Sequence, residues 1–142
     1  MQVSEVMSKH VDCISPEATL TAAAEQMRAL NVGALPVCDN DRLVGMITDR
    51  DIAVRSVAEG HDPCADRVRD VMTSKLYYCF DDQDIDQAGD VMREKQVRRL
   101  PVLNRQKRLV GIISLGDLAV ETGDEQLAGH VLEGVSEPSL SP

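Results

Sequence analysis

Aromatic side chains are almost absent from this chain of 142 residues, which contains no tryptophan, one phenylalanine and two tyrosines. A hydrophobic core must therefore be built from valine, leucine, isoleucine, methionine and alanine. Basic side chains are also few, since 15 lysines and arginines face 24 aspartates and glutamates, which gives a formal net charge of −9. This balance argues against duplex nucleic acid as a partner, because binding to phosphates needs clustered lysine and arginine.

Long hydrophobic runs are missing as well. No apolar stretch approaches the roughly 18 residues that a membrane-spanning helix requires. The first residues, Met-Gln-Val-Ser-Glu, lack the basic and apolar regions of a signal peptide. We therefore expect a cytoplasmic protein that does not contact a membrane. Its length corresponds to one ordinary domain or to two small units that share a core.

What the chain does contain is an internal repeat of three motifs. Residues 3–7 (Val-x-x-Val-Met) recur as 68–72, residues 32–37 (Val-x-x-Leu-Pro-Val) recur as 97–102, and residues 42–45 (Arg-Leu-Val-Gly) recur as 108–111. The offset is 65 residues for the first two motifs and 66 for the third. A repeat unit of this size cannot bury its apolar face alone, so the two copies must pack together, and a cleft between similar units is a natural ligand site.

Each copy shows the order strand, helix, strand, strand, helix. We expect strands at 11–14, 35–38, 43–47, 75–79, 100–103 and 109–113, and helices at 20–30, 48–60, around 85–92 and at 114–122. The prediction is a mixed α/β fold with a small mixed sheet in each copy. We place the first motif at 1–60, a linker at 61–67, the second motif at 68–123 and an acidic tail at 124–142 that is able to form a short helix over 124–133.

The third strand of each copy ends in Gly-x-Ile-Thr/Ser-x-x-Asp, with Thr48 and Asp51 in the first copy and Ser114 and Asp117 in the second. One interpretation is a capping box, in which the hydroxyl and the carboxylate satisfy backbone N–H groups at the start of a helix. The other is a ribose-phosphate clamp, because a helix N-terminus attracts anions and a carboxylate can accept two hydrogen bonds from a cis-diol. The residues alone leave both interpretations open.

The repeated motifs together resemble a tandem pair of CBS (cystathionine β-synthase) domains. The resemblance rests on the Val-Met openings, the Leu-Pro-Val strands, the Leu-Val-Gly hairpins and the two junctions, and it covers about residues 3–122. It is to the stand-alone type of pair, which is not fused to an enzyme or a channel. It implies two β-α-β-β-α motifs packed as a pseudo-twofold pair, a Bateman module, around two clefts that bind adenosyl ligands.

The resemblance also implies which residues bind the ligand. Asp51 and Asp117 would hold the ribose hydroxyls, and Thr48 and Ser114 would bind ribose or phosphate. The purine would lie between apolar residues of the first two strands, which are Val11, Ile14, Ala34, Leu35 and Pro36 in the first copy and Leu76, Cys79, Leu100 and Pro101 in the second. AMP, ADP, ATP, NAD and S-adenosylmethionine are all candidate ligands, and no cofactor is required.

The two copies differ in charge just before Leu-Pro-Val, where such modules often carry basic residues that reach phosphates. The second copy has Arg98-Arg99 and the first has Gly33-Ala34. Because two guanidinium groups can neutralise a phosphate chain, we expect one cleft to suit a phosphorylated nucleotide and the other to suit a less charged adenosyl ligand or to be empty. The alternative is that both arginines are solvated or pair with nearby carboxylates.

Four cysteines, at positions 13, 38, 64 and 79, form no dense disulfide framework. Cys13 and Cys38 end predicted strands that could be neighbours, so a disulfide between them would tie the geometry of the ligand site to redox state. The alternative is two buried free thiols in a reducing cytoplasm. We expect no metal site, because His61-x-x-Cys64 supplies two ligands where structural zinc needs about four.

The favoured hypothesis is a regulatory adenosine-nucleotide sensor. No nucleophile and base occur at a recognisable spacing, so we expect no enzymatic activity. Because CBS pairs commonly associate face to face, the resemblance implies a homodimer, for which an apolar stripe on the helices of each copy would supply the interface. No motif identifies a downstream protein partner. Two alternatives remain: a ligand-independent dimeric scaffold, in which the junction aspartates only cap helices, and a redox or stress sensor that uses Cys13 and Cys38.

Overall fold

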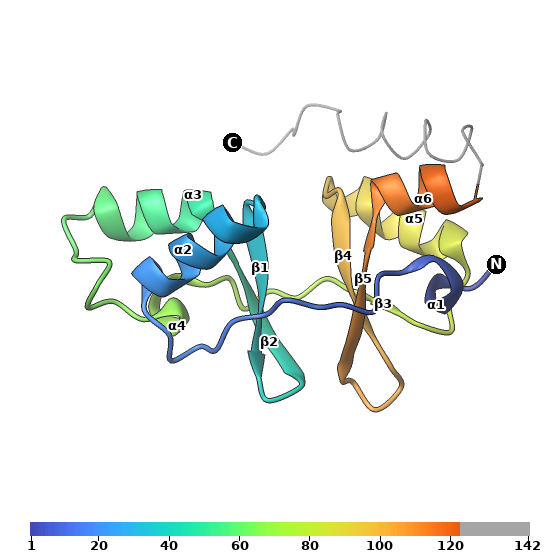
Figure 1. The fold of residues 1–142 in the computed structure, drawn as a ribbon, viewed down its shortest axis with the longest axis horizontal. Helices are drawn as coiled ribbons and strands as arrows, with labels where there is room; N and C mark the ends of the chain where they lie inside the picture. The colour runs from blue at the N-terminus through green and yellow to red at the C-terminus, as the bar shows by residue number, and fades with distance from the viewer. Residues whose placement is uncertain (123–142) are drawn as a thin grey trace. The chain divides into compact units, whose positions relative to one another are not determined.

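The computed structural model describes residues 1–122 of the chain (Figure 1). The helix expected at 124–133 and the acidic tail lie outside the described residues. Over 1–122 helices alternate with short strands, and the predicted mixed α/β fold is confirmed. None of the helices in this range has the length and apolar character needed to cross a membrane.

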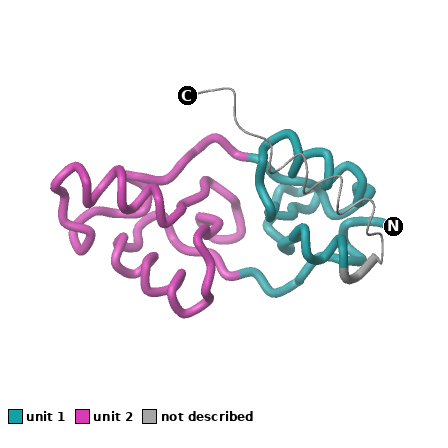
Figure 2. Tube along the Cα trace, turned by 90° about the horizontal axis from the view of Figure 1, so that it is seen from above, with its two compact units in different colours: residues 1–11, 77–142 teal, residues 12–76 magenta. Residues whose placement is uncertain are grey.

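The described chain divides into two compact units whose limits differ from those of the sequence repeat (Figure 2). Within the described residues, unit 2 comprises residues 12–76, and unit 1 comprises residues 1–11 and 77–122. The opening segment of each repeat therefore belongs to the unit that contains the hairpin of the other repeat.

In unit 2 one helix precedes a hairpin and a second helix follows it. The elements are α2 (Leu20–Leu30), β1 (Ala34–Asp39), β2 (Arg42–Thr48), α3 (Asp49–Ile52), the π-helical segment η1 (Ala53–Val57) and α4 (Val68–Val71). The antiparallel hairpin and α2 are confirmed, and the Thr19 hydroxyl caps α2 by accepting the backbone N–H of Ala22 at 3.2 Å. The helix expected at 48–60 ends at Val57. The strand expected at 11–14 is reduced to a single parallel bridge between Ile14 and Val37, since the chain enters unit 2 only at residue 12.

Unit 1 repeats this order with one more paired strand. Its elements are α1 (Val3–Val6), β3 (Cys79–Phe80), α5 (Ile85–Lys95), β4 (Arg99–Leu103), β5 (Leu109–Ser114) and α6 (Leu115–Thr122). The sheet has the order β3-β4-β5, in which β3 and β4 are parallel and β4 and β5 are antiparallel. The predicted mixed sheet is thus present in unit 1, although the strand expected at 75–79 is a two-residue strand that begins at Cys79. In unit 2 the sheet contains only the antiparallel pair β1-β2, so the prediction of a mixed sheet in each copy is wrong there.

Each unit has an aliphatic core that includes valines from the opening of the other repeat. Val68 and Val71 of α4 are buried in the core of unit 2, and Val3 and Val6 of α1 are buried in the core of unit 1. The pattern Val-x-x-Val did not lead us to predict these two short helices. Burial of their valines, worth about 25 cal/mol per Å² of apolar surface removed from water, joins each opening to its unit.

Gly45 in β2 allows the segment after α4 to cross the hairpin of unit 2 at very short range. A Cβ atom at this position would lie 2.8 Å from the Met72 sulfur and 2.8 Å from the backbone oxygen of Thr73. Thr73 is held there by two hydrogen bonds to the backbone of Met46, at 2.8 and 2.9 Å. Only glycine fits this crossing without displacing backbone atoms.

Gly111 in β5 has the same role in unit 1. A Cβ atom there would lie 2.5 Å from the Met7 sulfur and 2.8 Å from the backbone oxygen of Ser8. Ser8 exchanges two backbone hydrogen bonds with Ile112, at 2.8 and 3.0 Å. The repeated Leu-Val-Gly and Val-Met motifs therefore meet in space, each hairpin glycine beneath the methionine of the other repeat.

Candidate functional site

Both Gly-x-Ile-Thr/Ser-x-x-Asp junctions form the same pair of reciprocal hydrogen bonds. In unit 2 the Thr48 backbone N–H donates to Oδ2 of Asp51 at 3.0 Å, and the Asp51 N–H donates to Oγ1 of Thr48 at 3.1 Å. In unit 1 the Ser114 N–H donates to Oδ2 of Asp117 at 2.8 Å, and the Asp117 N–H donates to Oγ of Ser114 at 3.1 Å. The capping-box interpretation is confirmed at both junctions.

These capping bonds use only one oxygen of each carboxylate. Oδ1 of Asp51 lies 3.9 Å from Nε of Arg55, and 16% of the Asp51 side chain stays exposed. Asp117 is likewise only partly buried. An ionised carboxylate has about four acceptor positions, so each junction retains the capacity to accept hydrogen bonds from a diol.

The hairpin register places the residue before Leu-Pro opposite the junction hydroxyl. Ala34 is the cross-strand partner of Thr48, and Arg99 is the cross-strand partner of Ser114. Directly opposed residues of this kind have Cβ atoms about 5 Å apart. The structure thus brings together Arg99, Ser114 and Asp117, which the sequence had marked separately.

The charge difference between the copies is present at these positions. Arg98 and Arg99 are both exposed, and the backbone carbonyl of Arg98 accepts the Leu115 N–H at 2.8 Å. In unit 2 the carbonyl of Gly33 accepts the Asp49 N–H in the equivalent bond, at 2.9 Å. A Cβ atom on Gly33 would lie 3.1 Å from Oδ2 of Asp49. Unit 2 therefore has a glycine and a carboxylate at the positions where unit 1 has Arg98 and Leu115.

Four of the apolar residues expected around a purine are core residues. Ile14 and Leu35 are buried in the core of unit 2, at 6% and 1% exposed, and Cys79 and Leu100 are buried in the core of unit 1, at 1% and 0%. Their side chains support the strands from the core side.

The remaining apolar candidates lie elsewhere. Ala34 is exposed, whereas Pro36 and Pro101 are buried. Val11 and Leu76 are the last residues before the chain passes from one unit to the other, so Val11 belongs to unit 1 and Leu76 to unit 2. Neither is therefore grouped with the strands of its own repeat.

A family model for the CBS domain matches this chain twice, over residues 3–57 and 68–122. The chain belongs to the CBS domain family. It is 39% identical over 138 residues to the CBS domain-containing protein YhcV of Bacillus subtilis, which covers 97% of both chains. It is 43% identical over 116 residues to hypoxic response protein 1 of Mycobacterium tuberculosis, with 81% of this chain and 80% of the relative covered. The resemblance to a stand-alone CBS pair is thereby confirmed.

Solved CBS pairs have the same fold. The crystal structure of hypoxic response protein I with two coordinated zinc ions matches with a TM-score of 0.77 and 41% identity, and covers 85% of this chain and 98% of that one. The CBS domain pair of protein MJ0100, in complex with 5′-methylthioadenosine and S-adenosyl-L-methionine, matches with a TM-score of 0.73 and 25% identity over 88% of this chain and 98% of that one.

Because the hypoxic response protein I structure contains zinc ions, we compared the metal-binding side chains of this CBS pair. Within residues 1–122 no group of three or more His, Cys, Asp and Glu side chains is arranged to hold a metal ion. His61 Nδ1 lies 3.2 Å from Oδ2 of Asp66, and the Cys64 sulfur lies 3.2 Å from the Thr21 hydroxyl. The two side chains of His61-x-x-Cys64 thus have different partners.

The cysteines of this CBS pair are all free thiols in different surroundings. Cys13 and Cys64 are exposed, while Cys38 and Cys79 are buried. The pKa of Cys38 is raised to about 12, mainly by burial and to a smaller extent by the neighbouring Cys13 and Asp41. Burial also raises the pKa of Cys79 to about 12, helped by the charge of Asp81. The alternative in which both Cys13 and Cys38 are buried is wrong for Cys13, which is exposed.

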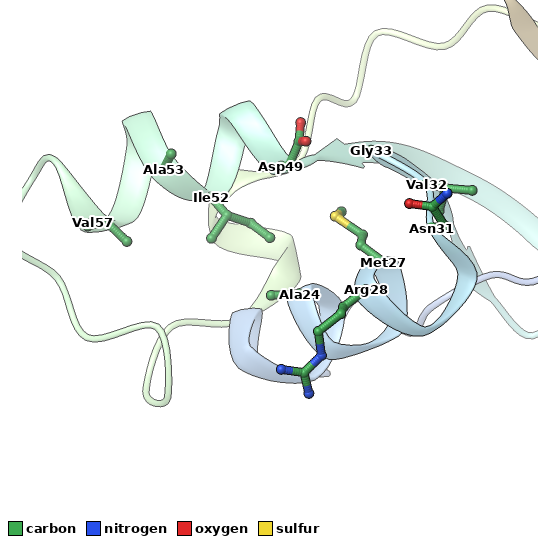
Figure 3. A pocket seen from close by; sticks show the side chains of 10 residues that line it. All are labelled: Ala24, Met27, Arg28, Asn31, Val32, Gly33, Asp49, Ile52, Ala53 and Val57. Atoms are coloured by element: carbon green, nitrogen blue, oxygen red, sulfur yellow. The ribbon is translucent and has the colours of Figure 1, made fainter.

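Sequence reasoning missed a cavity of about 540 Å³ on the helices of unit 2 (Figure 3). Its wall is mostly apolar and is formed by Ala24, Met27, Arg28, Asn31, Val32, Gly33, Asp49, Ile52, Ala53 and Val57. Figure 3 shows Arg28 on α2 and Asp49 at the start of α3 on opposite walls. Thr48 and Asp51 do not line the cavity, but Asp49 between them and Gly33 do, so the cavity adjoins the junction of unit 2. Ala24 and Met27 follow the apolar pattern of α2, and that pattern does not distinguish residues that line a cavity from residues of the core.

Proposed function

We propose that this CBS pair is a regulatory protein without catalytic activity that binds an adenosyl ligand at the junctions of Thr48 with Asp51 and Ser114 with Asp117. The observation that carries the proposal is the geometry of the junctions. Each carboxylate is oriented by one backbone hydrogen bond and keeps an oxygen available for ribose hydroxyls. The adenosyl ligands of the MJ0100 pair support this class of ligand.

The unequal charges favour different ligands for the two units. Arg98 and Arg99 flank the junction of unit 1 and suit a phosphorylated nucleotide such as AMP, ADP, ATP or NAD. The carboxylate of Asp49 beside Gly33 would repel phosphates, so unit 2 suits an uncharged or cationic adenosyl group such as that of S-adenosylmethionine. Replacing both arginines by alanine is expected to weaken binding of ATP and to leave binding of 5′-methylthioadenosine unchanged.

Regulation requires that the ligand bind two states of the protein with different affinity. The proposed ligand would then shift the population of states and change a surface that a downstream protein recognises. These ligands are cytoplasmic metabolites, and we place the protein there.

The first experiment is thermal unfolding of the full chain with each of AMP, ADP, ATP, NAD, S-adenosylmethionine and 5′-methylthioadenosine. A ligand present at 100 times its Kd stabilises the fold by about 2.7 kcal/mol, which raises the Tm of a chain of this length by several degrees. Asp51→Asn and Asp117→Asn are the informative variants, since an amide oxygen still accepts the capping N–H but binds a diol less well.

Asp70→Asn is the matched control. Asp70 accepts the backbone N–H of Arg67 at 2.9 Å in the capping box of α4, outside the proposed site. Loss of a ligand-induced Tm shift in Asp51→Asn or Asp117→Asn, but not in Asp70→Asn, would support the proposal. If no ligand shifts the Tm of the parent protein, the aspartates only cap helices and the scaffold hypothesis holds instead.

A homodimer through the helical face of unit 2 is the second part of the proposal. Val54 and Val57 of η1 are 46% and 58% exposed, and Val57 lines the cavity. A twofold contact between two copies of this face would pair Arg28 of one copy with Asp49 of the other. Val57→Glu is expected to convert a dimer into a monomer in sedimentation equilibrium. The control is Ala58→Glu, an exposed neighbour that does not line the cavity. A monomeric parent protein would refute this part.

A further inference from the structure

Cys13 and Cys38 are held near one another by the backbone of unit 2. The N–H of Ile14 donates to the carbonyl of Pro36 at 3.0 Å, and the N–H of Cys38 donates to the carbonyl of Ile14 at 3.0 Å. On the other side, Nε2 of Gln26 in α2 donates to the carbonyl of Cys13 at 3.2 Å. Both cysteines therefore stand on backbone that is fixed in place, and their proximity does not depend on a loop closing.

The two thiols interact directly. Beyond the effect of burial, the pKa of Cys38 is raised by the charge of Cys13 and by a side-chain hydrogen bond with Cys13. Such effects need neighbouring sulfur atoms. The pair is also asymmetric, because Cys13 is exposed whereas Cys38 is only 5% exposed.

We propose that Cys13 and Cys38 are a redox modification site at which a peroxide forms an intramolecular disulfide. The thiolate of the exposed Cys13 attacks one oxygen of the peroxide, the O–O bond breaks, and the departing hydroxide leaves as water after taking a proton. The sulfur of Cys38 then attacks the sulfenic acid on Cys13, the S–O bond breaks, and the expelled hydroxide takes the Cys38 proton as a second water. Two thiols are oxidised and one hydrogen peroxide is reduced to two waters.

Only one unit can undergo this reaction. The residues that correspond to Cys13 and Cys38 in the second repeat are Tyr78 and Leu103. A disulfide would join the segment before Ile14 covalently to β1 of unit 2 and leave unit 1 unchanged. This modification does not depend on the proposed ligand.

The test uses the folded full chain with hydrogen peroxide at a one-to-one ratio. After quenching, the protein is unfolded, alkylated without reductant and weighed by mass spectrometry. We expect two alkylated cysteines in place of four, and a dithiothreitol-sensitive peptide that links Cys13 to Cys38. A cross-link constrains the unfolded chain, so the Tm is expected to rise by several degrees and to return after reduction.

Three single variants assign the bond. Cys64→Ser removes the other exposed thiol and should still lose two alkylation sites on oxidation, whereas Cys13→Ser should lose none. Cys38→Ala should form no disulfide and should lose only the Cys13 site, which then carries added oxygen. The proposal is overturned if all four thiols of the parent protein remain alkylable. It is equally overturned if Cys13 gains oxygen atoms without forming a bond to Cys38, or if oxidation yields only disulfide-linked dimers.

Discussion

Gly45→Ala is the substitution that most directly tests how the opening of one repeat is held by the hairpin of the other. The added methyl group would lie 2.8 Å from both the Met72 sulfur and the Thr73 backbone oxygen. The methionine side chain can rotate away, but the carbonyl cannot. It can retreat only if Thr73 lengthens or loses its two hydrogen bonds to Met46.

The loss in free energy of unfolding can be estimated either from the steric overlap or from the lost hydrogen bonds. Overpacking of a filled site typically costs 1–3 kcal/mol, here about 2, and two backbone hydrogen bonds at roughly 1 kcal/mol each give the same figure. For a chain of 142 residues a loss of this size lowers the Tm by several degrees. Gly111→Ala, with Met7 and Ser8 as its neighbours, is expected to behave alike, and urea unfolding followed by circular dichroism measures both.

Gly116→Ala is the matched control, because its Cβ would meet only the Ser114 hydroxyl, at 3.6 Å. Gly116 lies in α6, where alanine is favoured over glycine by up to about 1 kcal/mol. The same chemical change should therefore stabilise the protein there. If Gly45→Ala and Gly111→Ala unfold at the urea concentration of the parent protein, the close crossings are absent in solution and the assignment of the openings to the opposite repeats fails.

Three further predictions concern individual side chains. Because burial raises the pKa of Cys38 and that of Cys79 to about 12, iodoacetamide at pH 8 should alkylate two cysteines of the native protein and all four only after unfolding; rapid labelling of four would contradict the burial. Ser56 is fully buried and its hydroxyl donates to a carboxylate at 3.0 Å, so Ser56→Ala should cost about 1–2 kcal/mol in urea unfolding, and a neutral result would disprove that bond. Two hydrogen bonds from Arg105 hold the pKa of Asp82 below its ordinary value. The stability that the ionised Asp82 contributes is therefore fully present above the pKa of the unfolded chain, near 3.9, and is lost as the pH falls through the lower pKa of the folded protein. The small Tm difference between the parent protein and Asp82→Asn should therefore be constant near neutral pH and disappear in acid, whereas a difference that grows in acid would reverse the sign of this reasoning.

Local features of the fold could be predicted because their causes are local. The helix at 20–30 follows from apolar residues at helical spacing and from the Thr19 cap, and both junction caps follow from a hydroxyl and a carboxylate three residues apart. The charge difference between Arg98-Arg99 and Gly33-Ala34 is also legible in the chain. What was not predictable is that Asp49 turns its carboxylate toward Gly33, since that depends on how the hairpin meets α3.

By itself the sequence determined the repeat, the mixed α/β class, the positions of the junction residues and the membership in the CBS domain family, because each depends on the order and spacing of side chains. Only the tertiary structure decided that the segments with Met7 and Met72 cross the hairpin of the opposite repeat, and that Cys13 lies exposed beside a buried Cys38. Both hairpins contain a glycine and lie on an aliphatic core, so by local sequence each opening segment fits either hairpin. The choice between them therefore depends on chain connectivity and on which pairing buries the valines of α1 and α4, and no local pattern contains that information.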